Sequence, residues 1–571
     1  MLKFLKNHNY VKSSTLKHRF SFKYKQNYSS YAKMDENLEH DSSFARYQES
    51  IEKLNELQPV QAIKTSDFST LKDLRLTSTK LMCKKLNLTD EDINKLNVIH
   101  ITGTKGKGST SAFSESILRN LGYKTGLFTS PHLIEVKERI KINGRSLSYL
   151  KFHEYFSHCY NILINNWSRE DKFDRPTYFQ FLTCMSFFVF SQEKVDAAIV
   201  EVGIGGQFDF TNIVEQPIVC GISSLGLDHC SLLGSTIDKI AWQKAGILKS
   251  SCVGFISQQD SKEALNVLKE RSLELNAPIC IVNNVDKYVD LSSKNIDLGI
   301  NGKVQYLNSQ LALQITNYWI QTQTQKNFNK NQWIEQNIKE VSEQGIPILQ
   351  PIVVLDDLRK EGITSCKWPG RNQIIESDNK NIKYYLDGAH TVESIEQFLN
   401  WFLDVKKNEP NFKNEKNVLL FNYTGERDPS KFLELLTALK FDAVAFSKLK
   451  AFPDELNKEK DTFRKMPSVV LDNDEKYENL LKMYINLADE KYKKCDVNNN
   501  EHFESKSQVF DNILESLDWL TDSRDEVLRK KLSETKAVCT SSDNDQNINV
   551  LITGSLYLVG LALKVLRFKI D

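Results

Sequence analysis

A glycine-rich turn at residues 103–110, GTKGKGST, constrains the fold of this chain more than any other feature. The apolar run 98–101 precedes it, as a short buried strand would. The segment 111–121 follows it with apolar residues at helical spacing, and Gly122 stands where a helix usually ends. A strand, a glycine turn and a helix in this order predict a phosphate-binding loop within an α/β domain.

The residues of this turn indicate its ligand. Glycines allow backbone N–H groups to face an anion, and the N-terminus of the following helix adds its dipole. Lys107 offers a positive charge to phosphates, and Ser109 or Thr110 offers a hydroxyl to a phosphate or a metal ion. The spacing departs from the common G-x-x-x-x-G-K-[ST] loop, because Gly108 separates Lys107 from Ser109. The pattern favours a nucleoside triphosphate over a purely structural turn.

The domain organisation follows from the length and from alternating patterns. At 571 residues the chain is long for a single core, so two or more domains are expected. From residue 97 onward, strand and helix patterns alternate, which is typical of a parallel sheet covered by helices. We expect an α/β protein with a parallel-sheet P-loop ATP-binding domain at 45–350. A proline-bearing, charged linker at 346–367 would lead to a smaller α/β domain at 363–571.

Several segments stand apart from this alternation. Residues 47–57 have the pattern of a short amphipathic helix, and polar residues within 179–190 favour a buried helix over a membrane span. Residues 485–508 and 540–548 are rich in Asn, Asp, Glu and Lys and are interpreted as polar surface insertions. The ten cysteines form no C-x-x-C pair, which favours reduced, structural thiols.

Charge is distributed unevenly along the chain. The net charge of +1 argues against a nucleic-acid binder whose affinity rests on a basic surface. Residues 1–34 nevertheless contain seven Lys and one Arg but no Asp or Glu. Such a leader resembles a mitochondrial transit peptide, with a disordered basic tail as the alternative. Met34 stands at its border, so a second translation start there would give a leaderless form, and we expect both mitochondrial and cytoplasmic localisation.

Polar side chains follow three of the predicted strands. Ser130 comes shortly after the apolar run 125–128, and Glu201 closes an otherwise apolar strand pattern. His229 follows the apolar run 217–223. Past the carboxyl ends of parallel strands, these side chains can converge beside the glycine-rich turn. Because Mg²⁺ prefers oxygen ligands and retains water and phosphate oxygens, we predict a magnesium site here. A Ser-Pro turn, a buried salt bridge and a satisfied histidine are the structural alternatives.

Four further residues carry groups that can act chemically. Lys244 lies in an apolar helical pattern, where the pKa of a lysine can shift, although a structural lysine is the common case. In the second region, Arg371 can reach phosphates as a planar fork of donors, and Asp387 can accept from a ribose. His390 stands at the start of the following helical pattern, near any anion held there.

Nine motifs, in order, give the chain a close resemblance to a known family. It resembles the folylpolyglutamate synthases of eukaryotes, within the Mur-ligase-like family of ATP-dependent amide ligases. The resemblance covers most of residues 45–450 and returns at 551–566. The motifs are HITGTKGKGST, TSPHLIEVKERIKING, RPTYFQFLT, EVGIGGQFDFTN, LGLDH, WQKAGI, WPGRNQ, YLDGAH and LFNYTGERDP.

The resemblance implies an ATP domain, a smaller glutamate-binding domain, and catalysis in the cleft between them. The residues that it assigns to ATP are Gly106, Lys107, Gly108, Ser109, Arg371 and Asp387. It assigns Mg²⁺ to Ser130, Glu201 and His229, and a monovalent cation such as K⁺ is a further expected cofactor. The segment that falls where bacterial relatives hold the pteroate portion of folate comprises Thr177, Tyr178, Phe179 and Gln180.

The implied catalytic residues are Lys107, Lys244 and His390. Lys244 matches a lysine that is carbamylated in bacterial relatives and bridges to the metal. Gln243 stands where those relatives carry Glu, so the sequence leaves this modification open.

The resemblance also implies the reaction. ATP would phosphorylate the γ-carboxylate of tetrahydrofolate or a folylpolyglutamate, and the α-amine of L-glutamate would attack the acyl phosphate. The expected partners are ATP, reduced folate and L-glutamate, with no nucleic acid and no membrane insertion, and the chain is expected to be a monomer. Two alternatives stay open: a dihydrofolate synthase that joins glutamate to dihydropteroate, and a nucleotide-binding regulator without ligase activity. Intact Lys107, Glu201 and His229 argue against the regulator.

Overall fold

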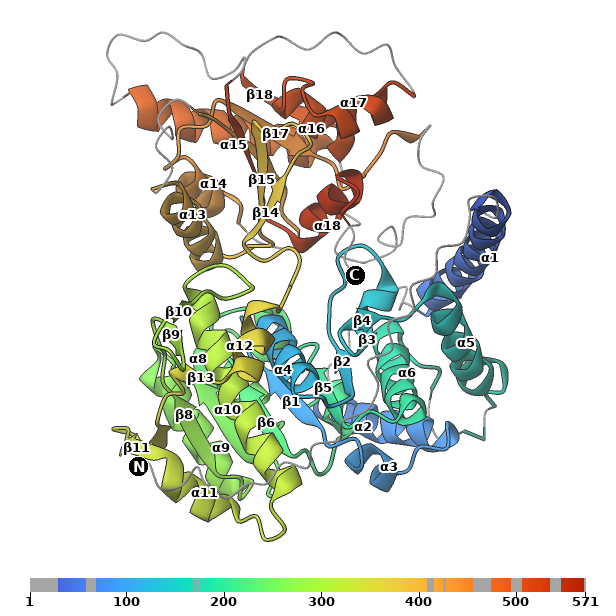
Figure 1. Ribbon diagram of the computed structural model, residues 1–571, viewed down its shortest axis with the longest axis vertical. Coiled ribbons are helices and arrows are strands. Elements are labelled where there is room, and N and C mark those ends of the chain that lie inside the picture. The colour runs from blue at the N-terminus through green and yellow to red at the C-terminus, as the bar shows by residue number, and fades with distance from the viewer. Residues whose placement is uncertain are drawn as a thin grey trace.

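Of the three β-sheets in the described part of the chain, the ten-stranded and the six-stranded sheet are each covered by helices and organise the fold (Figure 1). The computed structural model describes residues 29–57, 68–168, 170–171, 174–407, 415–424, 428–454, 474–493, 506–534 and 546–568. The larger sheet occupies the lower part of Figure 1 and the smaller sheet the upper part. This is the α/β class predicted from the sequence, a large parallel-sheet domain followed by a smaller α/β domain.

The larger sheet has ten strands in the order β11-β12-β8-β7-β6-β1-β5-β2-β3-β4. Strands from β12 to β2 in this order pair in parallel, whereas β11, β3 and β4 are antiparallel additions at the edges. Its central strands are short apolar runs that are buried on both faces, as a parallel sheet between helices requires. The strands are β1 (Ile99–Thr102), β2 (Thr125–Phe128), β3 (Ile140–Ile142), β4 (Arg145–Ser146), β5 (Ala197–Glu201), β6 (Val219–Ile222), β7 (Val253–Ser257), β8 (Ile279–Val282), β11 (Ile338–Val341) and β12 (Pro347–Leu349).

The strand order changes direction around β1. From β1 the chain passes to β2 on one side, skipping the place that β5 later takes. It then passes from β5 to β6 across β1 to the other side. The connections of the sheet thus run to opposite sides of β1. The loops after β1, β5 and β6 lie at this change in strand order, which is where open parallel sheets bind their ligands.

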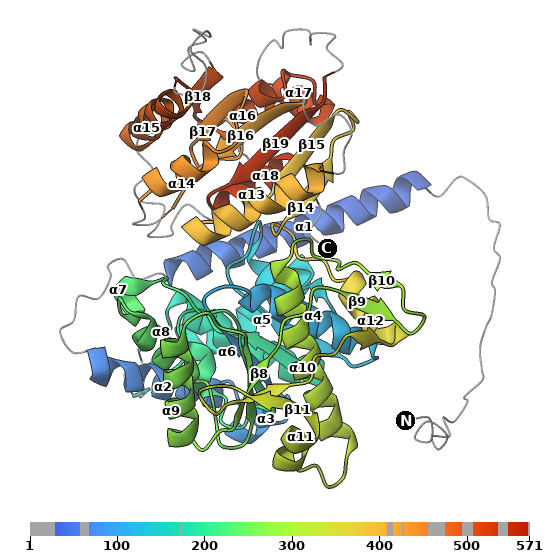
Figure 2. The ribbon, with the colours of Figure 1, turned by 90° about the vertical axis from the view of Figure 1, so that its left-hand side faces the viewer.

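Helices cover both faces of the larger sheet (Figures 1 and 2). Helices α4 and α10 pack on one face, against β1, β6 and β7, while α6, α8 and α9 pack on the other. The helices of this part are α3 (Asp90–Asn94), α4 (Lys107–Asn120), η1 (Val136–Arg139), α5 (Tyr149–Tyr160), η2 (Asn161–Asn165), α6 (Tyr178–Glu193), η3 (Phe210–Ile213), α7 (Cys230–Leu233), α8 (Ile237–Ala245), α9 (Lys262–Glu274), α10 (Val304–Thr324) and α11 (Lys330–Asn337).

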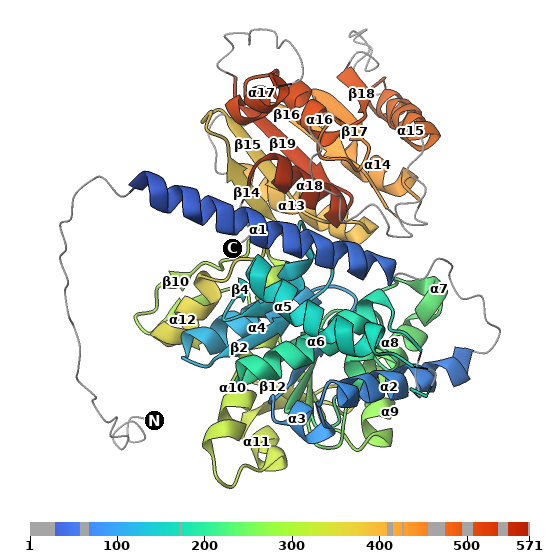
Figure 3. The same ribbon diagram turned by 90° about the vertical axis from the view of Figure 1, so that its right-hand side faces the viewer.

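The N-terminal helices are α1 (Ser29–Glu56) and α2 (Phe68–Lys85), and Figure 3 shows α1 along its length. Tyr47, Ile51 and Leu54 of α1 are buried in the core that also holds Phe152 of α5. The predicted helix at 47–57 is confirmed as the end of this longer helix. Most of the predicted leader, residues 1–28, lies outside the described residues.

The segment 346–367, expected to be a linker, is instead structured. It contributes β12 to the large sheet, β13 (Val354–Leu355) to a small sheet of order β10-β9-β13, and α12 (Asp357–Thr364). The other two strands of the small sheet are β9 (Tyr288–Asp290) and β10 (Asn295–Ile296). Gly362 lies so close to α4 that a Cβ there would stand 2.8 Å from Ile117 Cα. The expectation was wrong because Pro and charge also occur at strand edges and on short surface helices. The bounds 45–350 and 363–571 stay a prediction.

The second sheet has the order β14-β15-β19-β16-β17-β18, parallel except for β14. Helices α13 to α15 pack on one face and α16 to α18 on the other. The strands are β14 (Gln373–Glu376), β15 (Ile382–Leu386), β16 (Lys416–Phe421), β17 (Ala443–Ser447), β18 (Ser507–Phe510) and β19 (Ile548–Thr553). The helices are α13 (Val392–Lys406), α14 (Ser430–Leu436), α15 (Asp474–Lys493), α16 (Ile513–Leu520), α17 (Glu526–Leu532) and α18 (Leu556–Val565).

The predicted polar insertions are only partly outside the folded elements. Residues 485–493 form the end of α15, and Ala488 is buried in the second core, which corrects the prediction for that part. Residues 494–505 and 540–545 lie outside the described residues, and Ile548 already begins β19.

The cysteines and the most apolar helix were also the subject of predictions. The eight cysteines among the described residues are free thiols, and seven of them are buried, as predicted for structural cysteines. Residues 179–190 belong to the buried helix α6. In the part of the chain that the structure describes, every helix is too short or too polar to cross a bilayer.

Removing one partner of a buried ion pair tests the packing of the second domain. Lys406 Nζ lies 2.8 Å from Glu415 Oε2, and the two side chains are only 1% and 6% exposed. We expect Lys406→Ala to lower the free energy of unfolding by about 3–5 kcal/mol, because it leaves a buried carboxylate without its cation. Lys407→Ala is the matched control, since its exposed pair with Asp404 is worth at most about 1 kcal/mol. Equal losses in urea unfolding of the two variants would contradict this account.

His100 gives the first domain a pH-dependent stability. Burial lowers the pKa of His100 to about 3, because the charged imidazolium loses its hydration. The unfolded histidine binds a proton near pH 6.5, so between pH 6.5 and 3 the unfolded chain holds more protons than the native one. Stability contributed by this group therefore falls as the pH falls, by roughly 3 kcal/mol between pH 7 and pH 4. His100→Leu should flatten this part of the stability profile in urea unfolding, and an unchanged slope would exclude His100 as its source.

Candidate active site

The glycine-rich loop, residues 103–110, lies between β1 and α4, as the sequence predicted. Gly106 is the N-cap of α4 and has a left-handed backbone, with φ at 85°. A Cβ there would lie 2.2 Å from Asn308 Oδ1, and one on Gly103 would lie 1.9 Å from Ser223 Oγ. Glycine is thus required at both positions, by backbone conformation and by close neighbours. This conformation opens the first N–H groups of α4 toward an anion.

Two predicted lysines meet at one carbonyl oxygen beneath the loop. Lys107 Nζ donates to Gly103 O at 2.9 Å, and Lys244 Nζ donates to the same atom at 2.7 Å. Lys244 is 3% exposed. Burial and the charge of Lys107 hold the pKa of Lys244 well below its usual range, although Asp228 and Asp209 oppose the shift. The loop is therefore anchored to α8 through Lys244.

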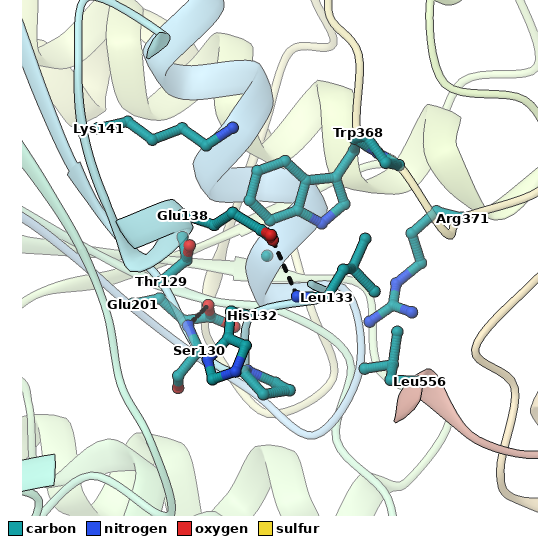
Figure 4. Close-up of a pocket in the computed structure, with 13 residues that line it drawn as sticks. Thr129, Ser130, His132, Leu133, Glu138, Lys141, Glu201, Trp368, Arg371 and Leu556 are labelled. Atoms are coloured by element: carbon teal, nitrogen blue, oxygen red, sulfur yellow. Dashed lines mark hydrogen bonds between the residues drawn. The ribbon is translucent and has the colours of Figure 1, made fainter. Parts of the chain in front are cut away.

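Ser130 and Glu201 come together beside the loop, as predicted. The Ser130 backbone N–H donates to Glu201 Oε2 at 2.9 Å, and Glu201 is 4% exposed. Burial raises the pKa of Glu201, while Lys107, the Ser130 N–H and Arg371 act in the opposite direction. Figure 4 shows both residues in one pocket with Trp368 and Arg371. The pocket also includes Gly108, so it reaches the start of α4.

The third predicted magnesium ligand, His229, lies on the loop after β6, and its place in the metal site stays a prediction. It is exposed, has a left-handed backbone with φ at 51°, and its Nε2 lies 3.9 Å from Asp228 Oδ2. His229 is absent from the pocket that contains Ser130 and Glu201. Among the described residues, no three His, Cys, Asp or Glu side chains gather closely enough to hold a metal ion. The donor pair of Ser130 and Glu201 fits Mg²⁺, which takes the rest of its shell from water and phosphate oxygens.

The second domain supplies residues to the same place. Arg371 lines the pocket, and Asp387 Oδ2 accepts from Asn372 N at 2.8 Å. Burial raises the pKa of Asp387, and the charge of Arg371 counteracts this. His390 Nδ1 donates to Gly388 O at 2.8 Å, which leaves Nε2 facing Asp228 Oδ2 at 3.9 Å. The structure thus brings Arg371 to the pocket and His390 to the Asp228 loop.

Two ion pairs and one close backbone contact join the two domains. Lys105 of the glycine-rich loop pairs with Glu393 of α13 at 3.1 Å, and Lys303 pairs with Asp404 at 2.8 Å. Gly560 of α18 packs against Leu133, where a Cβ would lie 1.9 Å from Leu133 O. These contacts hold the second sheet over the carboxyl ends of the first.

The loop after Ser130 is fixed by a carboxylate that the sequence did not single out. Glu138 accepts hydrogen bonds from the backbone N–H groups of Leu133, Ile134 and Glu135, at 2.5–2.9 Å. Its neighbour Arg139 donates through Nε to a ring nitrogen of the buried His132 at 3.0 Å. Both residues lie in the quoted motif TSPHLIEVKERIKING, but only the fold shows that they organise the loop.

The four candidate folate residues have different surroundings. Phe179 packs on the Glu201 loop, where a Cβ on Gly203 would lie 2.6 Å from its ring, and it contacts Phe128 and Phe210. Tyr178 is buried beneath the guanidinium of Arg139. Gln180 donates to Ser78 and Thr79 of α2, and Thr177 is the N-cap of α6. Of the four, Phe179 is thus the residue that packs against the glycine turn after Glu201.

Two further residues at the loop were not assigned a role from sequence. Asn308 is buried on α10, and its Oδ1 has no hydrogen-bond partner among the described residues. Trp368 Nε1 lies 3.2 Å from the position of a Cβ on Gly108. Amide side chains at Gln305, Asn308 and Gln310 on the buried face of a helix are the signal that could have indicated Asn308.

The chain is similar to known synthases over almost its whole length. It is 35% identical to the mitochondrial folylpolyglutamate synthases of Cricetulus griseus and Homo sapiens, and each alignment covers 91% of this chain and 92% of the relative. It is 34% identical to the folylpolyglutamate synthase of Candida albicans, over 92% of this chain and 97% of that one. No family model matches the sequence.

Solved structures have the same fold at lower identity. The Mycobacterium tuberculosis folylpolyglutamate synthase complexed with ADP superposes with a TM-score of 0.65 at 20% identity, over 92% of this chain and 99% of that one. A folylpolyglutamate synthase complex with AMPPCP and folate gives a TM-score of 0.59 at 20% identity, over 91% and 99%. Together with the sequence relatives, these findings lead to one conclusion: the chain belongs to the folylpolyglutamate synthase family.

Proposed function

We propose that this protein adds L-glutamate to the γ-carboxylate of reduced folate and of folylpolyglutamates, with ATP as the activating substrate. The observation that carries the proposal is the pocket in which Glu201 and Ser130 lie beside the start of α4 with Arg371 from the second domain. Such a pocket can hold a triphosphate between an oxygen-donor pair and a guanidinium. The membership of the chain in the folylpolyglutamate synthase family supports the choice of substrates.

The first half-reaction transfers the γ-phosphoryl group of ATP to the folate carboxylate. The carboxylate oxygen attacks phosphorus, ADP leaves, and an acyl phosphate forms. Negative charge develops on the transferred group, and the loop N–H groups at the start of α4 face it. Lys107 exchanges its bond to Gly103 O for the phosphates, and Arg371 offers its planar fork from the opposite side. Asn308, buried behind Gly106, supports the turn that carries these N–H groups.

Ser130 and Glu201 are the residues that would hold Mg²⁺, with His229 as the further predicted ligand. When bound, the cation supplies charge neutralisation to the phosphate oxygens. The peptide N–H of Ser130 fixes the Glu201 carboxylate, so the residue is oriented before the ligand arrives. Carbamylation of Lys244 and the expected K⁺ stay predictions.

The second half-reaction forms the amide. The α-amine of glutamate attacks the acyl carbon, and collapse of the tetrahedral intermediate releases phosphate. Water would hydrolyse the acyl phosphate, so the two domains must enclose it. The pairs Lys105–Glu393 and His390–Asp228 bridge the two domains at this place. His390, whose Nε2 faces Asp228 of the first domain, is the residue proposed to steer the second half-reaction.

The folate substrate is proposed to bind next to the Glu201 loop. Phe179 offers a partly exposed aromatic ring against Gly203, which suits stacking with a flat pterin or benzoyl ring. Of the four predicted residues, Gln180 is already used in hydrogen bonds to α2, so its contribution is to hold α6.

The proposed localisation includes the mitochondrion. The mitochondrial names of the mammalian relatives support it, as does the basic segment 1–34. A cytoplasmic form that starts at Met34 and a monomeric state are proposed on sequence grounds alone.

Product analysis tests the reaction. The protein is incubated with tetrahydrofolate, ATP and L-glutamate, and the products are examined by mass spectrometry. We expect a series of folates that differ by whole glutamyl units, together with ADP. Product formation from dihydropteroate instead of tetrahydrofolate would favour the dihydrofolate synthase. Nucleotide binding without any turnover would favour a regulator.

Lys107→Ala tests the phosphoryl-transfer step. We expect a decrease in kcat of about 10²–10³-fold, because one preorganised cation opposite the transferred group is lost. Lys105→Ala is the control from the same loop, since its ammonium pairs with Glu393 at the domain boundary. Its loss should be less than about tenfold, as for one partly exposed ion pair. Near-normal turnover of Lys107→Ala, with the fold verified by circular dichroism, would remove Lys107 from the mechanism.

Glu201→Gln tests the magnesium site. The amide keeps the size of the side chain but removes its charge, so the Mg²⁺ concentration for half-maximal rate should rise at least about tenfold. Glu215→Gln, which changes an exposed carboxylate paired with Lys80, is the control and should leave it unchanged. The same Mg²⁺ dependence in both variants would place the cation elsewhere.

A further inference from the structure

One side-chain amide outside the pocket holds a loop that, in turn, holds the glycine-rich loop. Gln259 follows β7, and its Oε1 accepts from the backbone N–H of Leu225 at 2.8 Å. Its Nε2 donates to Ser223 O at 3.3 Å and to Ser257 O at 2.8 Å. Both ends of the amide are therefore used, and the 223–226 loop after β6 is tied to the end of the neighbouring strand.

The 223–226 loop contacts the glycine-rich loop along its whole first half. Ser224 O accepts from the N–H groups of Thr104 and Lys105, at 2.9 and 3.1 Å. Thr104 Oγ1 donates to Gly226 O at 3.0 Å and accepts from Gly226 N at 3.1 Å. Ser223 Oγ donates to Lys105 O at 2.6 Å. Residues 104 and 105 precede α4, so these bonds, rather than helical ones, fix their backbone.

We propose that Gln259 is a positioning residue for ATP: through the 223–226 loop it sets the conformation of residues 103–105, and with it the place of Lys107 and of the first N–H groups of α4. The inference rests on the proposed binding of ATP phosphates at residues 106–109. The same loop leads directly into Asp228 and His229, so Gln259 also fixes the segment that faces His390.

The chemistry of the contacts requires an amide at this position. Gln259 must accept one hydrogen bond and donate two, and only an amide combines both functions on a neutral side chain of this length. A glutamate would place negative charge against Ser223 O and Ser257 O, and a methionine would offer neither strong donor nor strong acceptor. Gln259→Met therefore removes the three bonds at nearly constant volume.

Steady-state kinetics of the full-length chain tests this role. We expect Gln259→Met and Gln259→Glu to lower kcat/KM for ATP by about ten- to a hundredfold, since misplacement of a catalytic loop by an ångström has effects of this size. The KM values for folate and for glutamate should stay within about twofold of the parent values. The neighbouring, exposed Gln258 provides the matched control, Gln258→Ala, which should behave as the parent protein.

This split among the substrates separates positioning from simple loss of structure. A merely structural role would reduce the active fraction and lower kcat, with all three KM values unchanged. Thr104→Val removes the hydroxyl contacts to Gly226 at the other end of the same network. Its effect should be non-additive with that of Gln259→Met, because both act through the 223–226 loop.

Two results would overturn the inference. The first is a kcat/KM for ATP in Gln259→Met within twofold of that in Gln258→Ala. The second is that the effects of Gln259→Met and Thr104→Val on kcat/KM for ATP add. If Gln259→Met does not fold, Thr104→Val is measured alone. The inference then fails unless Thr104→Val raises KM for ATP and leaves the other two KM values unchanged. A failure of the proposed function can be told apart from a failure of this inference. If ATP did not bind at residues 106–109, Lys107→Ala would leave ATP turnover unchanged, whatever the effect of the Gln259 variants.

Discussion

The carbonyl oxygen of Gly103 is the point on which the rest of the site depends. It receives Lys107 from the start of α4 and Lys244 from α8, so one atom joins the glycine-rich loop to both layers around the sheet. Burial lowers the pKa of Lys244, and the positive charge of Lys107 on the same carbonyl oxygen lowers it further. Phosphate oxygens arriving at the start of α4 would relieve the repulsion between the two lysines, because they offer Lys107 a negatively charged partner. The site is thus prepared for an anion by its own lysines.

The second domain completes the site without contributing to the sheet that carries the loop. Arg371 enters the pocket beside Glu201, and the ion pairs Lys105–Glu393 and Lys303–Asp404 join the two domains. Those pairs are partly exposed, so each contributes little stability and can break when substrates enter or leave. By contrast, the packing of Gly560 on Leu133 is close enough to exclude any side chain. A tight contact between backbones combined with weak charge pairs is suited to a cleft that closes around an acyl phosphate and reopens.

Local patterns in the sequence predicted a large part of this arrangement. The strand before Gly103, the helix after it, and Glu201 at the end of β5 follow from apolar periodicity and from the cost of burying an unpaired carboxylate. Periodicity does not predict which loops contact one another in the folded chain. Gln259 and Asn308 become significant only because β7 and α10 lie beside the loop after β1. Ser130, Glu201 and His229 were predicted to converge because all follow parallel strands, and the left-handed backbone at His229 is a feature that periodicity could not predict. The linker at 346–367 failed for a similar reason, since pairing with β8 makes a short polar-flanked run into a strand.

The central claim is that ATP activates a carboxylate before the amide forms. Folate labelled with ¹⁸O in both oxygens of its γ-carboxylate tests it most directly, with the released phosphate examined by mass spectrometry. The acyl-phosphate route predicts one ¹⁸O in each phosphate, because the oxygen that attacks phosphorus leaves with it when the amine displaces it. Phosphate free of label, formed at the same rate as the amide product, would contradict the account.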